Sequence, residues 1–127
     1  MAAGKNNPPM SGFIKYWLPV IIYAILIFCL SSIPGKDIPR LFAGQSTFFH
    51  VIEYAIFALL INRALKAHYP GLIYPRRILL VFLLSFIYAI SDEFHQLFVP
   101  GRYASGFDLF TDGLGSFLGS LFYRWQR

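Results

Sequence analysis

Four apolar stretches take up most of the chain and constrain its fold more than any other feature. They cover roughly residues 13–32, 48–65, 78–96 and 107–125, and a helix needs about 20 mostly apolar residues to cross a bilayer. Only 13% of the residues are charged, against 57% that are hydrophobic, which is too few charged groups to cover a soluble globule of this size. The sequence therefore predicts an all-α integral membrane bundle of four transmembrane helices.

The third stretch shows that polar residues belong to these helices. It is purely apolar only from Ile78 to Ile90, which is too short to span a membrane. The polar turn that continues to Gln96 must therefore be helical, and Pro100 and Gly101 then end the helix. We expect one membrane domain over residues 13–127, preceded by a cytoplasmic N-terminal tail of residues 1–12.

Basic residues set the expected orientation, because Lys and Arg are enriched in the cytoplasmic segments of membrane proteins. With the N-terminus inside, three basic residues lie outside, namely Lys36, Arg40 and Arg102. Eight lie inside: Lys5, Lys15, Arg63, Lys66, Arg76, Arg77, Arg124 and Arg127. Both termini are thus predicted to be cytoplasmic. Because these bases flank apolar runs, the net charge of +5 indicates contact with the lipid bilayer and not with nucleic acid.

This orientation places His50 and Glu53, the polar turn from Asp92 to Gln96, and Asp108 at the outer ends of their helices. Ionisable residues inside a membrane are candidates for function by default. The candidate catalytic residues are His50, Glu53, Asp92, Glu93, Asp108 and Asp112. Gln96 joins His50, Asp92, Glu93 and Asp108 as a candidate ligand-binding residue.

Each group also has a structural alternative. His50 and Glu53, at i and i+3, could share a proton or fix helix packing. The cluster at Asp92 and Glu93 could bind a cation or keep one acid protonated, while Glu93 could instead lie at a solvated helix end. Asp112 lies so deep that it needs neutrality or a partner such as His50 or Arg102.

Gly115 and Gly119 lie on the same face of the last helix as the two aspartates. Small residues at this spacing allow close helix contact, so we interpret both glycines as packing residues.

Arg102 is the basic residue nearest in sequence to the acidic cluster. Its five donors could grip a phosphate or carboxylate at the headgroup level. Alternatively, it could contact lipid phosphates or form a salt bridge with Asp108.

No cofactor is required by the sequence, although a divalent cation is compatible with the acidic cluster. The chain has one cysteine, Cys29, and no Cys/His zinc pattern, Walker loop or serine nucleophile motif.

Three motifs carry a family resemblance. They are His50-x-x-x-Tyr54, Ser91-Asp92-Glu93-x-x-Gln96-x-Phe98-x-Pro100-Gly101-Arg102 and Asp108-x-x-x-Asp112-x-x-Gly115-x-x-x-Gly119. Together they resemble the VanZ-like family of bacterial membrane proteins. The resemblance implies a multi-pass protein of the bacterial cytoplasmic membrane and cell envelope, in a family associated with antibiotic resistance, specifically reduced susceptibility to the glycopeptide teicoplanin. The chain has Thr47 where the family often has Lys, and Asp112 where it often has Asn.

Three functions fit these observations. The leading hypothesis is binding of an anionic lipid-linked envelope precursor, or of a lipoglycopeptide, at the outer leaflet through Arg102 and the candidate ligand-binding residues. The second is a membrane-embedded hydrolase or transferase that uses His, Asp and Glu. The third is a noncatalytic subunit that packs through Gly115.

Overall fold

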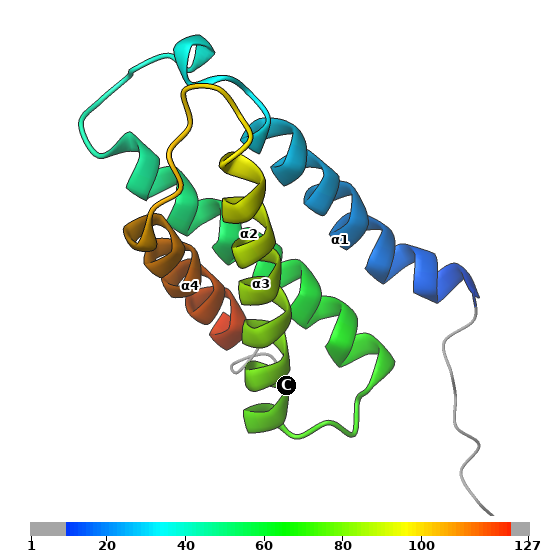
Figure 1. The fold of residues 1–127 in the computed structure, drawn as a ribbon. Helices are drawn as coiled ribbons and strands as arrows, with labels where there is room; N and C mark the ends of the chain where they lie inside the picture. The colour runs from blue at the N-terminus through cyan, green and yellow to red at the C-terminus, as the bar shows by residue number, and fades with distance from the viewer. Residues whose placement is uncertain (1–9, 123–127) are drawn as a thin grey trace, which may run out of the picture.

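The computed structural model describes residues 10–122 and forms a bundle of four α-helices (Figure 1). Helix α1 spans Met10–Ser31, α2 Gln45–His68, α3 Tyr74–Gln96 and α4 Gly106–Leu121, and a short 3-10 helix, η1, covers Gly35–Asp37. The described residues contain no strand, so the expected all-α fold class is confirmed. Lys5, Arg124 and Arg127 of the base count, most of the expected N-terminal tail, and the expected helix end at Trp125 lie outside the described residues.

Three of the helices are long and apolar enough to cross a membrane. They contain the segments Gly12–Ser31, Gln45–His68 and Tyr74–Gln96. Helix α4 has 16 described residues and is therefore about 24 Å long, against a hydrocarbon core of about 30 Å. The fourth span and the cytoplasmic position of both termini stay predictions.

Several expected helix boundaries differ from the observed ones by three or four residues, among them the starts of α2 and α3. Helix α2 begins at Gln45. The residue before it, Gly44, has a left-handed φ of 78°, so the helix cannot extend further toward the N-terminus. Helix α3 begins at Tyr74 and contains Pro75 in its first turn, where the missing N–H has no helical partner to lose. Arg76 and Arg77 therefore belong to helix α3 and not to the loop before it.

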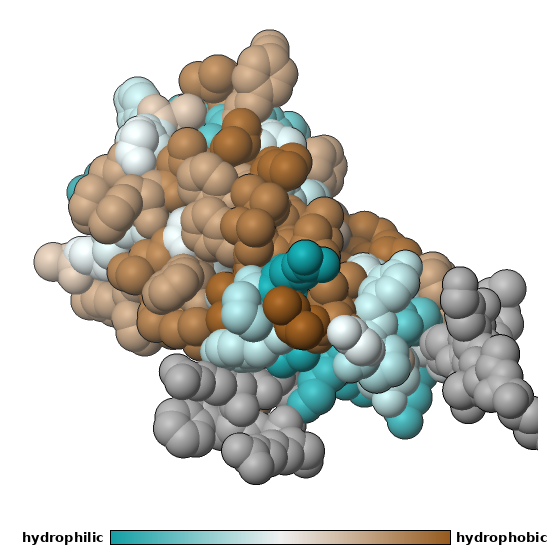
Figure 2. Space-filling model, turned by 90° about the horizontal axis from the view of Figure 1, so that it is seen from below, coloured by the Kyte–Doolittle hydropathy of each residue, from teal (hydrophilic) through white to brown (hydrophobic). Residues whose placement is uncertain are grey.

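The interior of the bundle contains polar as well as apolar side chains. Its fully buried side chains include Asn62, Asp112 and Ser85, whereas large apolar residues are exposed along the helices, for example Ile25 at 58% and Ile87 at 62%. Figure 2 views the end that carries the α2–α3 turn and shows hydrophobic residues over most of the visible surface. This distribution suits a lipid environment, because an apolar side chain that faces lipid tails is not exposed to water.

Helix α2 lies at the centre and α4 packs closely against it. A Cβ atom at Gly115 would lie 2.3 Å from the carbonyl oxygen of Val51, and one at Gly119 would lie 2.2 Å from that of Ala55. Any side chain at either position would therefore push the two helices apart. This approach lets short side chains on α4 reach α2, which positions the site described next.

Candidate functional site

The sequence candidates gather at one end of the bundle. The start of α2, the end of α3 and the start of α4 meet there, beside the end of α1 (Figure 1). Antiparallel neighbours joined by short loops bring these helix ends together. Most of the candidates lie in three neighbouring places. These are a buried cluster of His50, Glu93 and Asp112, a pocket beside it, and the loop between α3 and α4 that carries Arg102.

A hydrogen-bonded His–Asp pair forms the centre of the buried cluster. His50 Nδ1 lies 2.6 Å from Asp112 Oδ1, and both residues are buried, His50 at 7% exposure and Asp112 at 0%. Asp112 therefore has the buried partner that its depth in the bundle demands, and this partner is His50.

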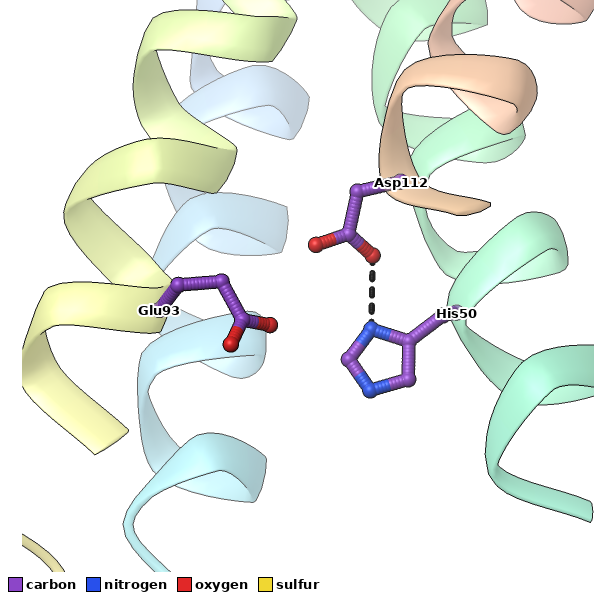
Figure 3. Close-up of side chains that lie close together, drawn as sticks. All are labelled: His50, Glu93 and Asp112. Carbon is purple, nitrogen blue, oxygen red and sulfur yellow. Dashed lines mark hydrogen bonds and ion pairs between the residues drawn. The ribbon is translucent and has the colours of Figure 1, made fainter. Parts of the chain in front are cut away.

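Glu93 completes the buried cluster from helix α3. Its side chain points toward the pair in Figure 3, and ligand atoms of Glu93, His50 and Asp112 lie within 4.8 Å of one another. Glu93 is only 6% exposed, so the alternative of a solvated helix end is wrong for this residue. Its Oε2 accepts a hydrogen bond from the Ser105 backbone N–H at 3.4 Å.

Two oxygens of this cluster lack any hydrogen-bond partner. Glu93 Oε1 and Asp112 Oδ2 are both buried and unpaired. Buried acceptors are nearly always satisfied in folded proteins, because an unmet one costs about 1–3 kcal/mol and more when it is charged. The arrangement could share a proton among its members or hold a divalent cation.

A pocket of about 510 Å³ opens beside the cluster. Its polar lining includes Asp37 and Gln45 together with five sequence candidates, namely His50, Glu53, Asp92, Gln96 and Arg102. Its apolar lining includes Tyr23, Leu30, Phe49 and Ile52. Five of the sequence candidates thus share one cavity, while Glu93, Asp108 and Asp112 are not among its lining residues.

Asp92 has a hydrogen-bond partner that was not predicted from the sequence. The hydroxyl of Tyr54 donates to Asp92 Oδ2 at 3.0 Å, and Tyr54 is fully buried. Tyr54 follows His50 by four residues and therefore lies on the same face of α2. That spacing was the available signal.

Arg102 holds the end of α1 in addition to lining the pocket. Its Nε donates to the Ile33 carbonyl oxygen and its Nη2 to that of Leu30, each at 2.9 Å. Leu30 lies in the last turn of α1 and Ile33 just after it, where carbonyl oxygens lack the donor that the next turn of a helix would supply. Three of its five N–H groups take part in neither bond. Sequence analysis did not foresee this capping role.

A close glycine contact fixes the same loop. A Cβ atom at Gly35 would lie 2.0 Å from the Gly101 carbonyl oxygen, and Gly101 has a φ of 74°. The Gly35 N–H donates to the Pro100 carbonyl at 2.9 Å. We call this contact, together with the two Arg102 bonds, the loop clamp; it joins the α3–α4 loop to the end of α1.

The remaining candidates have local roles in the fold. Asp108 is partly exposed in the first turn of α4, where a negative charge is favourable. Its backbone N–H is capped by Ser105 Oγ at 3.0 Å. It forms no salt bridge with Arg102, since His50 and Asp112 make the one ion pair found among residues 10–122. Gly115 and Gly119 face α2 of the same chain.

Comparison with known proteins adds a family match. The family model described as VanZ/LLP1 matches residues 16–127. Searches of curated proteins and of solved structures each found no match.

Proposed function

The chain belongs to the VanZ/LLP1 family, and from that membership we propose that it is a cell-envelope protein of the bacterial cytoplasmic membrane that binds an amphiphile. The polar headgroup would occupy the pocket beside His50, and the apolar part would lie along the exposed helices. The excess of basic residues at the opposite end supports a pocket that opens toward the outer leaflet.

The observation that carries this proposal is the mixed lining of the pocket. Small-molecule sites are concave and mostly apolar, with a few convergent polar groups. Here the apolar wall includes Leu30 and Ile52, and the polar groups include Glu53, Asp92 and Arg102. Such a lining suits a molecule with a polar head and an apolar tail.

The charges of the pocket narrow the chemistry of the headgroup. The carboxyl groups of Asp37, Glu53 and Asp92 outnumber the single guanidinium of Arg102. A bare phosphate would meet more repulsion than attraction, whereas hydroxyl or amine donors would bond to the carboxylates. The remaining N–H groups of Arg102 would contact an anionic group beside those donors. A lipid-linked envelope precursor and a lipoglycopeptide such as teicoplanin both have this combination.

Native mass spectrometry of the purified protein with a bacterial lipid extract tests the proposal. Glu53→Gln and Asp92→Asn should each reduce retention of the bound amphiphile at least about tenfold, a change of about 1.4 kcal/mol. Asp108→Asn is the matched control, because Asp108 lies at the same end of the bundle outside the pocket lining. Equal retention by all three variants would eliminate this pocket.

Arg102 needs a separate comparison because it also holds α1. Arg102→Lys keeps a donor for one α1 carbonyl but loses the planar fork, so it should bind the anionic group more weakly. Gly35→Ala is the control that disturbs the loop clamp while it keeps the guanidinium. Teicoplanin susceptibility of a host that depends on this protein gives the cellular readout. If the Arg102→Lys variant protected the host from teicoplanin as fully as wild type, the planar guanidinium of Arg102 would not contact the ligand.

A second candidate function is a hydrolase or transferase, favoured by the His50–Asp112 pair at 2.6 Å. A carboxylate that orients an imidazole is the arrangement of a general base. An enzyme of this kind requires the acid–base group, so His50→Gln should abolish turnover of the bound amphiphile without abolishing its retention. Loss of retention alone would favour simple binding. The third candidate, a packing subunit, has less support because Gly115 already packs on α2.

A further inference from the structure

Three helices contribute one ligand-type side chain each to the buried cluster. His50 comes from α2, Glu93 from α3 and Asp112 from α4, and all three side chains point into the same space (Figure 3). One ligand atom from each lies within 4.8 Å of the others. Two ligands of a tetrahedral zinc ion lie about 3.4 Å apart, from bond lengths near 2.1 Å. Side-chain shifts of at most about 1.4 Å would bring the three ligand atoms to this spacing. They include a small separation of His50 Nδ1 and Asp112 Oδ1, which lie 2.6 Å apart.

When both of its carboxyl groups are ionised, the cluster has more negative than positive charge. Two carboxyl groups are buried beside one imidazole, and His50 and Asp112 form the one ion pair found among residues 10–122. A protonated imidazole balances only one carboxylate, whereas a doubly charged cation with a neutral imidazole balances both. An ion bound between Nδ1 and Asp112 Oδ1 would take the place of the shared proton, which would leave to solvent.

The two unpaired oxygens are a second, independent observation that favours a ligand at this cluster. Glu93 Oε1 and Asp112 Oδ2 are buried without any hydrogen-bond partner, in residues that are 6% and 0% exposed. The second oxygen of Glu93 is already held by the Ser105 N–H, as outer hydrogen bonds hold the ligands of metal sites. The unpaired oxygen is thus the one free to bind.

We propose that His50, Glu93 and Asp112 form a binding site for one divalent transition-metal ion, with Zn²⁺ as the best match. An imidazole nitrogen with two carboxylate oxygens suits Zn²⁺, while Mg²⁺ and Ca²⁺ prefer oxygen ligands alone. Three protein ligands leave a fourth position for water or a ligand, as in catalytic zinc sites. The site goes beyond headgroup binding, since neither Glu93 nor Asp112 lines the pocket.

Metal analysis of the full chain tests the site. The protein, purified in detergent without a histidine tag and in a Cys29→Ser background, is stripped with a chelator and given Zn²⁺. After desalting, inductively coupled plasma mass spectrometry should find about one zinc ion per chain. Competition with a chromophoric chelator should show at least about tenfold weaker binding for Glu93→Gln and Asp112→Asn, the loss expected even for an outer hydrogen-bond partner of a ligand.

Matched controls separate this site from other acids at the same end of the bundle. Glu53→Gln and Asp92→Asn remove carboxylates outside the cluster and should keep wild-type zinc affinity. If Asp112→Asn fails to fold, Glu93→Gln decides, because Glu93 Oε1 has no hydrogen bond to lose. Co²⁺ should give the visible absorption of a four-coordinate ion in wild type only.

Several outcomes would overturn the proposal. They are no zinc retained by wild type, unchanged affinity in Glu93→Gln, an equal loss in the Glu53→Gln control, or a preference for Mg²⁺ or Ca²⁺ over every transition metal. Preference for Mn²⁺ or Fe²⁺ through the same three residues would support the site.

Discussion

Two buried polar layers cross the same bundle, and they differ in how completely their atoms are paired. The closed layer contains Asn62, Arg77, Ser85, Ser116 and Ser120, and the open layer contains His50, Glu93 and Asp112. In the closed layer Arg77 Nε donates to Asn62 Oδ1 at 2.9 Å, and Asn62 Nδ2 donates to the Ser120 carbonyl at 2.8 Å. The hydroxyl oxygens of Ser85 and Ser116 lie 2.6 Å apart and share a hydrogen bond. In the open layer, two carboxylate oxygens have no partner.

We expect this difference to distinguish packing residues from binding residues better than burial does. Both layers are buried and both contain ionisable groups, so burial alone would mark Arg77 and Asp112 equally. Polar contacts between membrane helices that satisfy one another serve packing. An unsatisfied buried acceptor lowers the stability of the folded protein, and a bound ligand that pairs with it can restore that stability. The predictions below test this distinction.

The largest expected effect concerns which layer faces the outside. In a Cys29-free background, Tyr103→Cys lies in the loop beside the open layer and Gly71→Cys in the turn beside the closed layer; both positions are exposed. From the eight-to-three distribution of bases, a membrane-impermeant maleimide should label Tyr103→Cys in intact cells. Gly71→Cys should react only after permeabilisation. The reverse pattern would place the closed layer outside.

Both layers should collapse together when α4 is forced away from α2. Gly115→Leu places its Cβ 2.3 Å from the Val51 carbonyl oxygen. Overpacking costs about 1–3 kcal/mol when side chains can adjust, and a backbone contact cannot, so we expect about 3 kcal/mol or more. Thermal unfolding in detergent measures the loss. Gly106→Leu on the same helix has no atom within 4 Å of its Cβ and should change stability little.

The closed layer should lose stability when one member is removed. Asn62→Ala leaves Arg77 Nε and the Ser120 carbonyl without their partners. An unpaired buried group costs about 1–3 kcal/mol, so the free energy of unfolding should fall by that order. The same unfolding assay gives the value. An unchanged midpoint would mean that water or lipid replaces these bonds.

The open layer should respond with the opposite sign in metal-free protein. Glu93→Gln removes one of two neighbouring buried carboxylates and breaks no bond at Oε1. We expect stability to stay constant or to rise by up to about 1 kcal/mol, because an uncompensated buried charge is lost. Added Zn²⁺ should then stabilise wild type but not the variant. A loss as large as that of Asn62→Ala would contradict the distinction between the layers.

Much of the fold could be predicted from hydrophobic run lengths. The apolar stretches predicted the four helices, and the polar turn up to Gln96 was correctly included in the third helix. The start of α2 was missed by three residues, because Gln45, Ser46 and Thr47 are polar and lie outside the apolar run from which the helix was predicted. The short helix η1 was not predicted, since its position depends on contact with the α3–α4 loop.

The site could be predicted as a set of residues but not as a set of contacts. Asp92 and Glu93 are adjacent and lie about 100° apart on α3, so periodicity cannot tell which one faces the bundle. The structure buries both: Asp92 meets Tyr54, while Glu93 faces the pair of His50 and Asp112. Arg102 was expected at the ligand, yet two of its donors hold α1.

The sequence by itself determined that this is an all-helical membrane protein with its acids and two of its three histidines toward one end. It could do so because run length and residue order along a helix are local properties. Only the tertiary structure decided which of these polar atoms are satisfied. Satisfaction depends on the rotation of each helix about its axis and on how closely α2 and α4 approach, which the glycines at 115 and 119 permit. For that reason the closed layer and the open layer look alike in the sequence and differ in the fold.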